Sequence, residues 1–498
     1  MQNELAEKGR KMVTIIDPHI RRDNDYHVHA QAQQRGLYIK DKHGKDYEGW
    51  CWPGSSSWLD FLEPHVRSFW EGLFSFQEYK GSTPTLYTWN DMNEPSVFSG
   101  PEVTMHKDAV HLSGREHREV HNIYGLYQQK ATADGLVSRN PDKNLRPFVL
   151  SRAFFTGSQK YGAIWTGDNA AEWSHLDIAQ PMLLSLSIAG IHFCGADVGG
   201  FFGNPSAELF TRWMQAAVFH PFMRSHAHLD TKRREPWMYG EPYTSHIRDA
   251  IRMRYALLPY LYTLFHESST AGIPVMRPLW LEFPEDAGSF GRDREFMLGD
   301  ALLVRPVTHE GAHEQAVYLP AESTWFNVFT HEVLRGSGAE VFVPVSLGDI
   351  PVFQRAGTII ARKMRPRRST VPMARDPYTL HIALSEEQVA SGALYIDDGT
   401  TFNYRSGEYQ SCQVTCAGGV ISARLLAGTA DLPAGLSRAV ERIVVVGVPA
   451  APASVVASVH ADLRDAVGVD FEYADRTRVL TIKKPGVMFP AWSVKLEL

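Results

Sequence analysis

Two acidic side chains stand where apolar stretches of the sequence stop. Asp91 follows the run LYTWN at 86–90, and Asp168 follows GAIWTG at 162–167. Each run contains a tryptophan, Trp89 in the first and Trp165 in the second. Two carboxyl groups suit acid/base and nucleophilic chemistry at a glycosidic bond, and aromatic faces stack on sugar rings. These residue types therefore predict a sugar site.

The elements that carry the acids must bring them to one edge of a sheet. In an α/β barrel the C-terminal strand ends form the catalytic rim, because the barrel interior is filled with side chains. A third acid, Asp17, also follows an apolar run. Apolar runs alternate with helical spacing in this half of the chain. The pattern predicts six barrel strands, at about 12–16, 86–90, 147–152, 162–167, 191–197 and 221–226.

The segments between the strands differ in kind. Residues 21–54 lack clear periodicity, which predicts a long functional loop. Residues 57–79 carry apolar side chains at a spacing of 3.6, which predicts a helix. From about residue 273 the pattern changes to short strands separated by turns. The C-terminal part of the chain is therefore expected to be all β.

Composition excludes several classes of function. The net charge is −6, and no basic block is long enough for a nucleic-acid footprint. No apolar run is long enough to span a membrane, and the residues after Met1 do not read as a secretory signal. The four cysteines lack metal-binding spacing, so we expect free core thiols at Cys51, Cys194, Cys412 and Cys416.

Several short motifs of the sequence resemble those of glycoside hydrolase family 31. WNDMNEPSVF at 89–98 and WTGDN at 165–169 are similar to the family's nucleophile and acid/base motifs. The flanking words resemble its α-glucosidases, most of all the subgroup of catalytic α-subunits of endoplasmic-reticulum glucosidase II; they are GWCWPGSS, LSRAFFTGSQKYG and GADVGGFFGNP. The resemblance extends over nearly the whole chain.

The resemblance implies roles for individual residues. Asp91 would be the nucleophile and Asp168 the acid/base, with their carboxyl groups ~5–5.5 Å apart as a retaining mechanism requires. Glu94 would support Asp91 from the same loop. The residues implied to bind the sugar are Arg152, His226, Asp197, Trp89, Trp165, Trp52 and Phe201.

The resemblance also implies a fold and a setting. The fold would be an incomplete (β/α)8 TIM barrel, strands three to eight, at 1–275, followed by a proximal β-domain at 276–370 and a distal β-sandwich at 371–498. The activity implied is retaining hydrolysis of terminal α-linked glucose, with N-glycan trimming in the endoplasmic reticulum lumen as its setting. Neither cofactor nor metal is expected, and a regulatory β-subunit is an implied partner.

Two alternatives stay open on the residues alone. The first is a catalytically dead fragment, because the family aspartate on the second barrel strand has no counterpart in this sequence. The second is a metal-dependent barrel hydrolase, since His27-Val28-His29 and His226-Ala227-His228 are HxH pairs. Against the second, the first pair lies in the predicted loop, and 21 histidines make chance pairs common.

Overall fold

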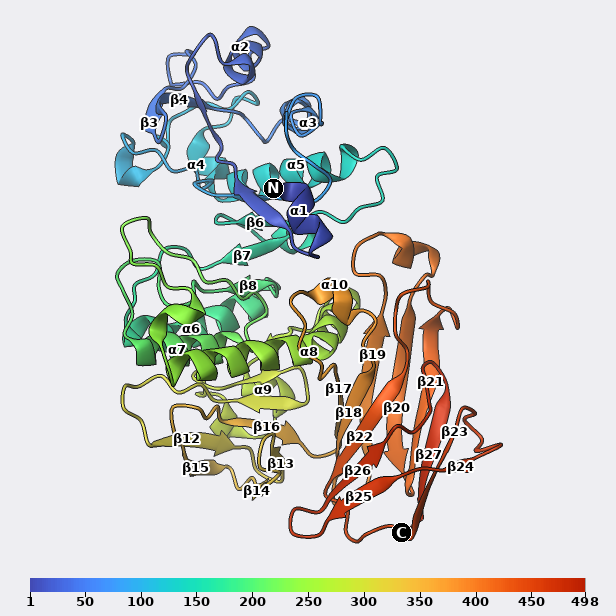
Figure 1. Ribbon diagram of the computed structural model, residues 1–498. Coiled ribbons are helices and arrows are strands. Elements are labelled where there is room, and N and C mark those ends of the chain that lie inside the picture. The colour runs from blue at the N-terminus through green and yellow to red at the C-terminus, as the bar shows by residue number, and fades with distance from the viewer. Residues whose placement is uncertain (498) are drawn as a thin grey trace. The chain divides into compact units, whose positions relative to one another are not determined.

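The computed structural model describes residues 1–497, and the chain forms two compact units (Figure 1). The first unit comprises residues 1–167 together with 400–402, and the second comprises 168–399 and the residues from 403 onward. Each unit has its own hydrophobic core.

A parallel sheet organises the first unit. Within this unit its strands lie in the order β1 (Met12–Ile15), β5 (Leu86–Asn90), β6 (Val149–Ser151) and β7 (Ala163–Trp165). Met12 pairs with Leu86, and Thr88 pairs with Val149, so all four strands end at the same edge. The acids predicted at strand ends therefore do follow strands. The other elements of this unit are α1 (Gln2–Glu7), β2 (His19–Arg21), α2 (His27–Gln34), β3 (Gly49–Cys51), β4 (Gly54–Trp58), α3 (Pro64–Gly72), α4 (His117–Val120) and α5 (Tyr124–Ser138).

The structure corrects two local expectations in this unit. Residues 21–54 are not a plain loop, because they form α2 and the outer strands of a small antiparallel sheet in the order β2-β4-β3. The helix predicted over 57–79 begins only at Pro64. Ser57 and Trp58 belong to β4, where they pair with β2, and a proline is favoured in the first turn of a helix.

Helices α3 and α5 pack against each other to close the core of the first unit. Trp70 of α3 is buried and donates its Nε1–H to Thr132 Oγ1 of α5 at 2.9 Å. Gly135 allows the close approach, since a Cβ there would lie 2.7 Å from the Phe74 ring. This packing positions the first turn of α5 beside the loop that follows β5.

The second unit begins with helices α6 (Trp173–Ile188), α7 (Ala207–Ala217) and α8 (Tyr243–Ala271), with the short strand β8 (Cys194–Gly195) between the first two. The prediction of a strand at 221–226 is wrong. Only one isolated parallel bridge forms there, between Asp197 and Arg224. The pairing stays this short because Pro221 starts the segment without an N–H and polar residues follow it.

Two antiparallel sheets come next in the second unit. The larger has the order β14-β13-β16-β11-β10-β9, and the smaller is the pair β12-β15. Their elements are β9 (Met276–Arg277), α9 (Leu279–Glu282), β10 (Phe296–Leu298), β11 (Leu302–Val304), β12 (Glu314–Leu319), β13 (Thr324–Asn327), β14 (Val333–Arg335), β15 (Ala339–Pro344) and β16 (Val352–Arg355). Trp325, Phe353 and Tyr318 fill the core between them.

The last part of the second unit is one eleven-stranded sheet in the order β24-β23-β27-β21-β20-β19-β17-β18-β22-β26-β25. Leu380 of β18 and Val494 of β27 are far apart in this order, yet both lie in one buried cluster. The sheet therefore folds over on itself as a β-sandwich. Its elements are β17 (Thr358–Arg362), α10 (Thr370–Met373), β18 (Tyr378–Ala383), β19 (Ala390–Ile396), β20 (Gln410–Ala417), β21 (Val420–Gly428), β22 (Val440–Val446), β23 (Ser454–Ser458), β24 (Val467–Gly468), β25 (Phe471–Ala474), β26 (Val479–Lys483) and β27 (Trp492–Glu497).

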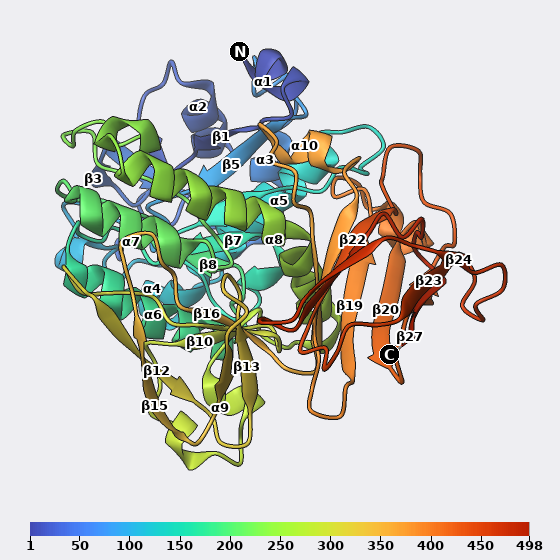
Figure 2. The same cartoon turned by 60° about the horizontal axis from the view of Figure 1, so that its bottom comes forward.

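Helix α8 lies along this sandwich, as both views show (Figures 1 and 2). His266 of α8 stacks on Tyr395 of β19 with ring centroids 3.9 Å apart, and the Tyr395 N–H donates to Thr263 Oγ1. The expected α/β part followed by an all-β part is confirmed.

The four cysteines are free and buried, as expected. In the described residues, no helix combines the length and the hydropathy that crossing a membrane requires.

Candidate active site

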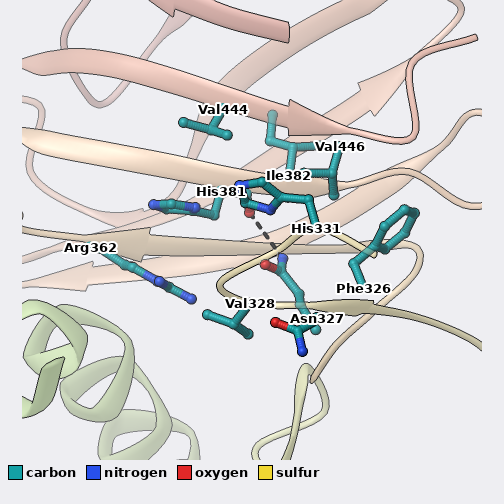
Figure 3. A pocket seen from close by; sticks show the side chains of 10 residues that line it. Phe326, Asn327, Val328, His331, Arg362, His381, Ile382, Val444 and Val446 are labelled. Carbon is teal, nitrogen blue, oxygen red and sulfur yellow. Dashed lines mark hydrogen bonds between the residues drawn. The ribbon is translucent and has the colours of Figure 1, made fainter. Parts of the chain in front are cut away.

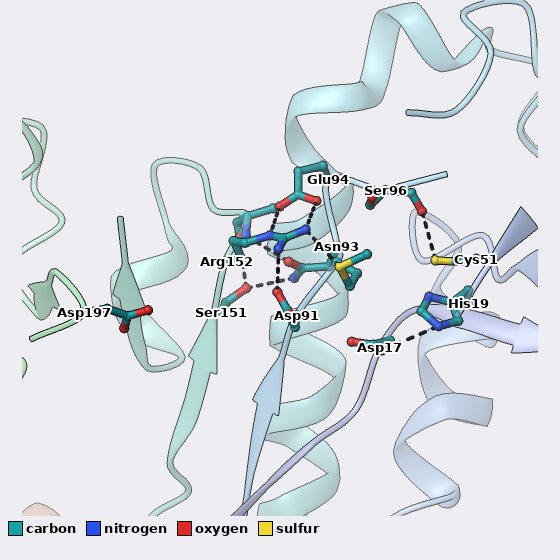
Figure 4. Close-up of polar contacts among 12 residues, drawn as sticks. Asp17, His19, Cys51, Asp91, Asn93, Glu94, Ser96, Ser151, Arg152 and Asp197 are labelled. Atoms are coloured by element: carbon teal, nitrogen blue, oxygen red, sulfur yellow. Dashed lines mark hydrogen bonds and ion pairs between the residues drawn. The ribbon is translucent and has the colours of Figure 1, made fainter. Parts of the chain in front are cut away.

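The loop after β5 places Asp91 at the C-terminal edge of the parallel sheet (Figure 4). Backbone bonds link the three strand ends there, because Ile16 N–H donates to Trp89 O and Arg152 N–H donates to Asn90 O. The Asn90 side chain also donates to Ile16 O at 3.1 Å. Asp91 is therefore held between the ends of β1 and β6.

Arg152 joins the two acids of this loop. Its Nε and Nη2 donate to the two carboxylate oxygens of Glu94, at 2.8 and 3.0 Å. Its Nη1 lies 3.1 Å from Asp91 Oδ1. A two-pronged pair of this kind fixes a guanidinium in position as well as in charge. Glu94 thus orients the arginine that faces Asp91.

Asn93 anchors the same loop to the end of β6 and the residues that follow it. Its Nδ2 donates to Ser151 Oγ at 2.8 Å, and its Oδ1 accepts from the Ala153 N–H at 2.9 Å. Gly125, in the first turn of α5, lies against this loop, where a Cβ would come 2.8 Å from Asn93 O. Backbone, amide and helix together leave the Asp91 loop little freedom.

Asp17 belongs to this cluster, although the sequence analysis did not assign it to the site. Burial, followed by the charge of Asp91, raises the pKa of Asp17 to about 7; Arg152 opposes the shift and Glu94 adds to it. Its Oδ2 lies 3.5 Å from His19 Nε2, and burial lowers the pKa of His19 to about 4. The sequence did contain a signal for Asp17, because the apolar run 12–16 ends directly before this acid.

The charges of the cluster add to burial in favouring the protonated form of Asp17. Asp17, Asp91 and Glu94 are three carboxyl groups around one guanidinium. With all three ionised, the net charge would be −2 in a partly buried place, which is costly. A proton on Asp17 reduces that charge and leaves Asp91 and Glu94 as the anions that pair with Arg152.

The aromatic side chains predicted to bind the sugar form edge-to-face pairs in the first unit. The rings of Trp89 and Trp165 meet edge to face with centroids 5.4 Å apart. Trp52 is 69% exposed and meets Phe98 edge to face at 4.8 Å. Trp52 and Asp17 both line an open cavity of about 660 Å³ in the first unit.

A second cluster lies in the second unit and begins at the residue after Asp168. Its neighbour Asn169 donates through Nδ2 to Asp197 O at 3.1 Å and accepts through Oδ1 from the Phe201 N–H at 2.9 Å. Asp197 is buried, and its Oδ1 accepts from Arg224 Nη2 at 2.6 Å. The segment after Asp168 is thus tied to the segment after β8.

His226 completes the second cluster. Its ring stacks on Phe201 with centroids 5.3 Å apart. Burial lowers the pKa of His226 to about 4, and the charges of Arg224 and Arg234 act in the same direction. The imidazole is therefore neutral at pH 7 and has one N–H to donate and one nitrogen to accept.

Asp91, Glu94, Arg152, Trp89, Trp165 and Trp52 belong to the first unit, and Asp168, Asp197, Phe201 and His226 to the second. The structure brings Asp91, Glu94 and Arg152 together, and it brings Asn169, Asp197, Phe201 and His226 together. The separation of the Asp91 and Asp168 carboxyl groups stays a prediction.

The HxH pairs are engaged in other contacts. His29 is buried in α2 and its Nδ1 lies 2.9 Å from the Tyr38 hydroxyl, which corrects the expected loop position. His226 and His228 both pack on the Phe201 ring. Within residues 1–497, no group of three or more His, Cys, Asp or Glu side chains is arranged to hold a metal ion.

A row of buried polar side chains extends through the first unit near α4 and α5. Asp60 Oδ1 lies 2.7 Å from His111 Nδ1, His111 Nε2 lies 3.1 Å from His117 Nδ1, and His117 Nε2 lies 2.8 Å from His121 Nδ1. Burial lowers the pKa of His117 to about 3, and the other two histidines add to the shift. No periodic pattern in the sequence indicated this row.

Comparison with known proteins agrees with this architecture. The model of the glycosyl hydrolases family 31 TIM-barrel domain matches residues 1–264, and that of the family's C-terminal domain matches 272–360. Neutral alpha-glucosidase AB of Dictyostelium discoideum is 52% identical over 491 residues, which are 98% of this chain and 51% of that protein.

Two solved structures are similar over the whole chain. The glucosidase II alpha subunit in its Glc1Man2-bound form has a TM-score of 0.94 and 40% identity, and the alignment covers 100% of this chain and 55% of that one. The ER glucosidase II heterodimeric complex, of the catalytic subunit and the binding domain of the regulatory subunit, gives 0.95 and 41% with the same coverage. The chain spans about half the length of these relatives. The chain belongs to glycoside hydrolase family 31, and the match to its TIM-barrel domain is followed by a match to its C-terminal domain.

Proposed function

We propose that this chain is the catalytic portion of a retaining α-glucosidase. The observation that carries the proposal is the first cluster, in which Asp91 lies 3.1 Å from an arginine that Glu94 holds in a fork. A nucleophilic carboxylate must be ionised, and an adjacent guanidinium stabilises that form. Nearby Asp17 takes the proton that the crowded cluster retains.

In the proposed mechanism Asp91 attacks the anomeric carbon and forms a covalent glycosyl-enzyme. Asp168 protonates the leaving oxygen, then removes a proton from the water that releases the sugar. Two inversions give net retention, which needs the two carboxyl groups ~5–5.5 Å apart.

The proposed sugar-binding residues divide by chemistry. Trp89, Trp165, Trp52 and Phe201 supply aromatic faces, while Arg152, Asp197 and the neutral His226 supply hydrogen bonds to hydroxyl groups. Asp197 already pairs with Arg224, so its part is to shape the pocket as well as to accept.

The proposed substrate is a terminal α-linked glucose on an oligosaccharide, with a glucose-capped N-glycan as the preferred form. The name of the Dictyostelium relative and the Glc1Man2 ligand of the solved alpha subunit support this choice. By the same reasoning the location is the endoplasmic reticulum lumen and a regulatory subunit is a partner, as in the solved heterodimer. The proposed division is a barrel part at 1–275, a proximal β-domain at 276–370 and a distal β-sandwich at 371–498.

The test uses the purified chain and a glucose-capped mannose oligosaccharide. Proton NMR should detect α-glucose before mutarotation, and Asp91→Asn should lower turnover more than about 10³-fold. A 5-fluoro-α-glucosyl fluoride should label the peptide that contains Asp91. Release of β-glucose first would contradict retention. No turnover by the unsubstituted chain would favour a catalytically dead member of the family.

The acid/base role has a separate test. Asp168→Ala should lose about 10²–10⁴-fold on the oligosaccharide and much less on an aryl α-glucoside, whose leaving group needs no protonation. Azide should speed up the variant and yield α-glucosyl azide. Equal losses on both substrates would contradict the acid/base role of Asp168. Separately, a preference of the unsubstituted chain for an α-xyloside over an α-glucoside would contradict the proposed substrate.

A further inference from the structure

A small cavity in the second unit is lined by residues of several strands, Phe326, Arg362 and His381 among them (Figure 3). It lies where the six-stranded sheet meets the sandwich, since β13 and β16 line one side and β17, β18 and β22 line the other. Phe326, Ala383 and Val446 form an apolar cluster at the same junction. Any ligand bound there would link the two sheets.

Arg362, the last residue of β17, contributes a buried cation to the cavity. The residue is 6% exposed, and its Nε and Nη2 are buried without a hydrogen-bond partner. Among residues 1–497 no carboxylate forms an ion pair with it. Burial lowers the pKa of Arg362 to about 10, so the guanidinium still carries its charge at pH 7. A buried charge without a counter-ion is costly.

The other polar groups around the cavity are two histidines and two amide side chains, His331, His381, Asn327 and Gln354. His381 Nε2 is buried without a partner. His331 and Gln354 line the same cavity, and the Gln354 amide donates to His381 O (Figure 3). Burial, followed by the charge of Arg362, lowers the pKa of both His331 and His381, and Arg442 acts on His381 in the same direction. Arg362 is therefore the buried charge of the cavity, and Arg442 adds positive charge near His381.

Size and charge together restrict what can occupy this cavity. The space open to the centre of a water-sized sphere is about 10 Å³, which leaves room for a single water molecule or small ion. Sulfate, phosphate and carboxylates are too large for it. A water molecule could accept one hydrogen bond from Arg362, but it would leave the buried charge without compensation.

We propose that this cavity binds a single halide-sized monovalent anion, chloride under physiological conditions, through Arg362 and His381. The anion accepts the N–H groups that are otherwise unpartnered and neutralises the guanidinium at the junction of the two sheets. Its role is to stabilise that junction. The proposal is independent of the catalytic activity proposed above.

The first test compares thermal unfolding of the full chain in sodium gluconate, chloride, bromide and sulfate at equal ionic strength. Chloride and bromide should raise Tm by on the order of 2 °C relative to gluconate and saturate with concentration, since a ligand that binds only the native state stabilises it. Arg362→Met should lose this difference. Arg424→Met is the matched control, because Arg424 is exposed on β21 and pairs only with Gln413, and it should keep the difference.

A second measurement decides the matter even if Arg362→Met does not fold. Crystals of the unsubstituted chain soaked in sodium bromide should show an anomalous peak beside the Arg362 guanidinium. An ordered water there, with no anomalous peak, would overturn the proposal. A Tm that rises with salt concentration by the same amount in gluconate, sulfate and chloride would also overturn the proposal, because an equal rise reports ionic strength and not binding at a site.

Discussion

Glu94 holds Arg152 through two parallel hydrogen bonds, and the third nitrogen of the same guanidinium faces Asp91. An arginine held by one carboxylate presents a fixed positive charge to the other. The distance between Arg152 and Asp91 therefore depends on Glu94, which is three residues from Asp91 in sequence.

The first prediction tests this dependence. In Glu94→Gln one of the two anionic acceptors is lost, so Arg152 shifts toward Asp91 and the nucleophile is misplaced. We expect kcat to fall about 10²-fold, because a displacement near 1 Å in a catalytic group costs that much, while KM changes less. Glu102→Gln is the control. Glu102 lies in the same loop but is exposed, with Lys107 at 3.4 Å, so steady-state kinetics should change less than about twofold. Equal effects of the two variants would contradict the role of Glu94.

The second prediction concerns pH and Asp17. Its folded-state pKa, about 7, lies above the value of 3.8 for a free side chain, so the folded state binds more protons between these values. The free energy of unfolding therefore falls as pH rises from about 4 to about 7. The Asp17→Asn variant lacks the titrating carboxyl group and so does not lose stability in this way. Its free energy of unfolding, relative to that of the original chain, should therefore increase by up to about 4 kcal/mol between pH 4 and pH 7.

Urea unfolding at a series of pH values measures the effect. Asp25→Asn is the control, since Asp25 is exposed, and its difference from the original chain should not vary with pH. A stability difference for Asp17→Asn that is flat between pH 4 and 7 would show that Asp17 titrates normally.

The third prediction concerns the row of histidines. Burial keeps His117 neutral, with a pKa of about 3 against 6.5 for a free imidazole, so the unfolded chain binds more protons between these values. Stability is therefore lost as pH falls below about 6.5, by up to about 1.4 kcal/mol per pH unit. His117→Gln should be less stable at pH 7 but show a shallower acid dependence. His43→Gln, at an exposed position, should leave the slope unchanged, and an unchanged slope in both variants would contradict the prediction.

The fourth prediction concerns Gly200, beside the second cluster. A Cβ at this glycine would lie 2.3 Å from Ala171 N, and its φ of +81° is unfavourable for other residues. Gly200→Ala should lower the free energy of unfolding by more than the roughly 1–3 kcal/mol of backbone strain alone and should also reduce activity. Gly240→Ala separates the two causes, because φ is +71° there and the space is open. If both variants lose the same stability, the close approach to Ala171 contributes nothing.

The sequence predicted the elements that depend on local pattern. The strands β5, β6 and β7 coincide with short apolar runs, because buried parallel strands must be apolar. Asp91 comes directly after β5, because the ends of such strands reach solvent. The change to an all-β region after residue 273 was equally visible in the alternation of apolar and polar residues. By contrast, residues 221–226 have strand-like composition at one end only, and tertiary pairing limits them to a single bridge.

The sequence by itself determined the family, the strand-end acids and the order of α/β and all-β parts, since these depend on spacing along the chain. Only the tertiary structure decided that Arg152 pairs with Asp91 and with Glu94, which is 58 residues away. It also decided that burial raises the pKa of Asp17, and that Arg362 is buried without an anionic partner among residues 1–497. Charge pairing and desolvation depend on distance and burial in space, and neither quantity is a function of position in the sequence.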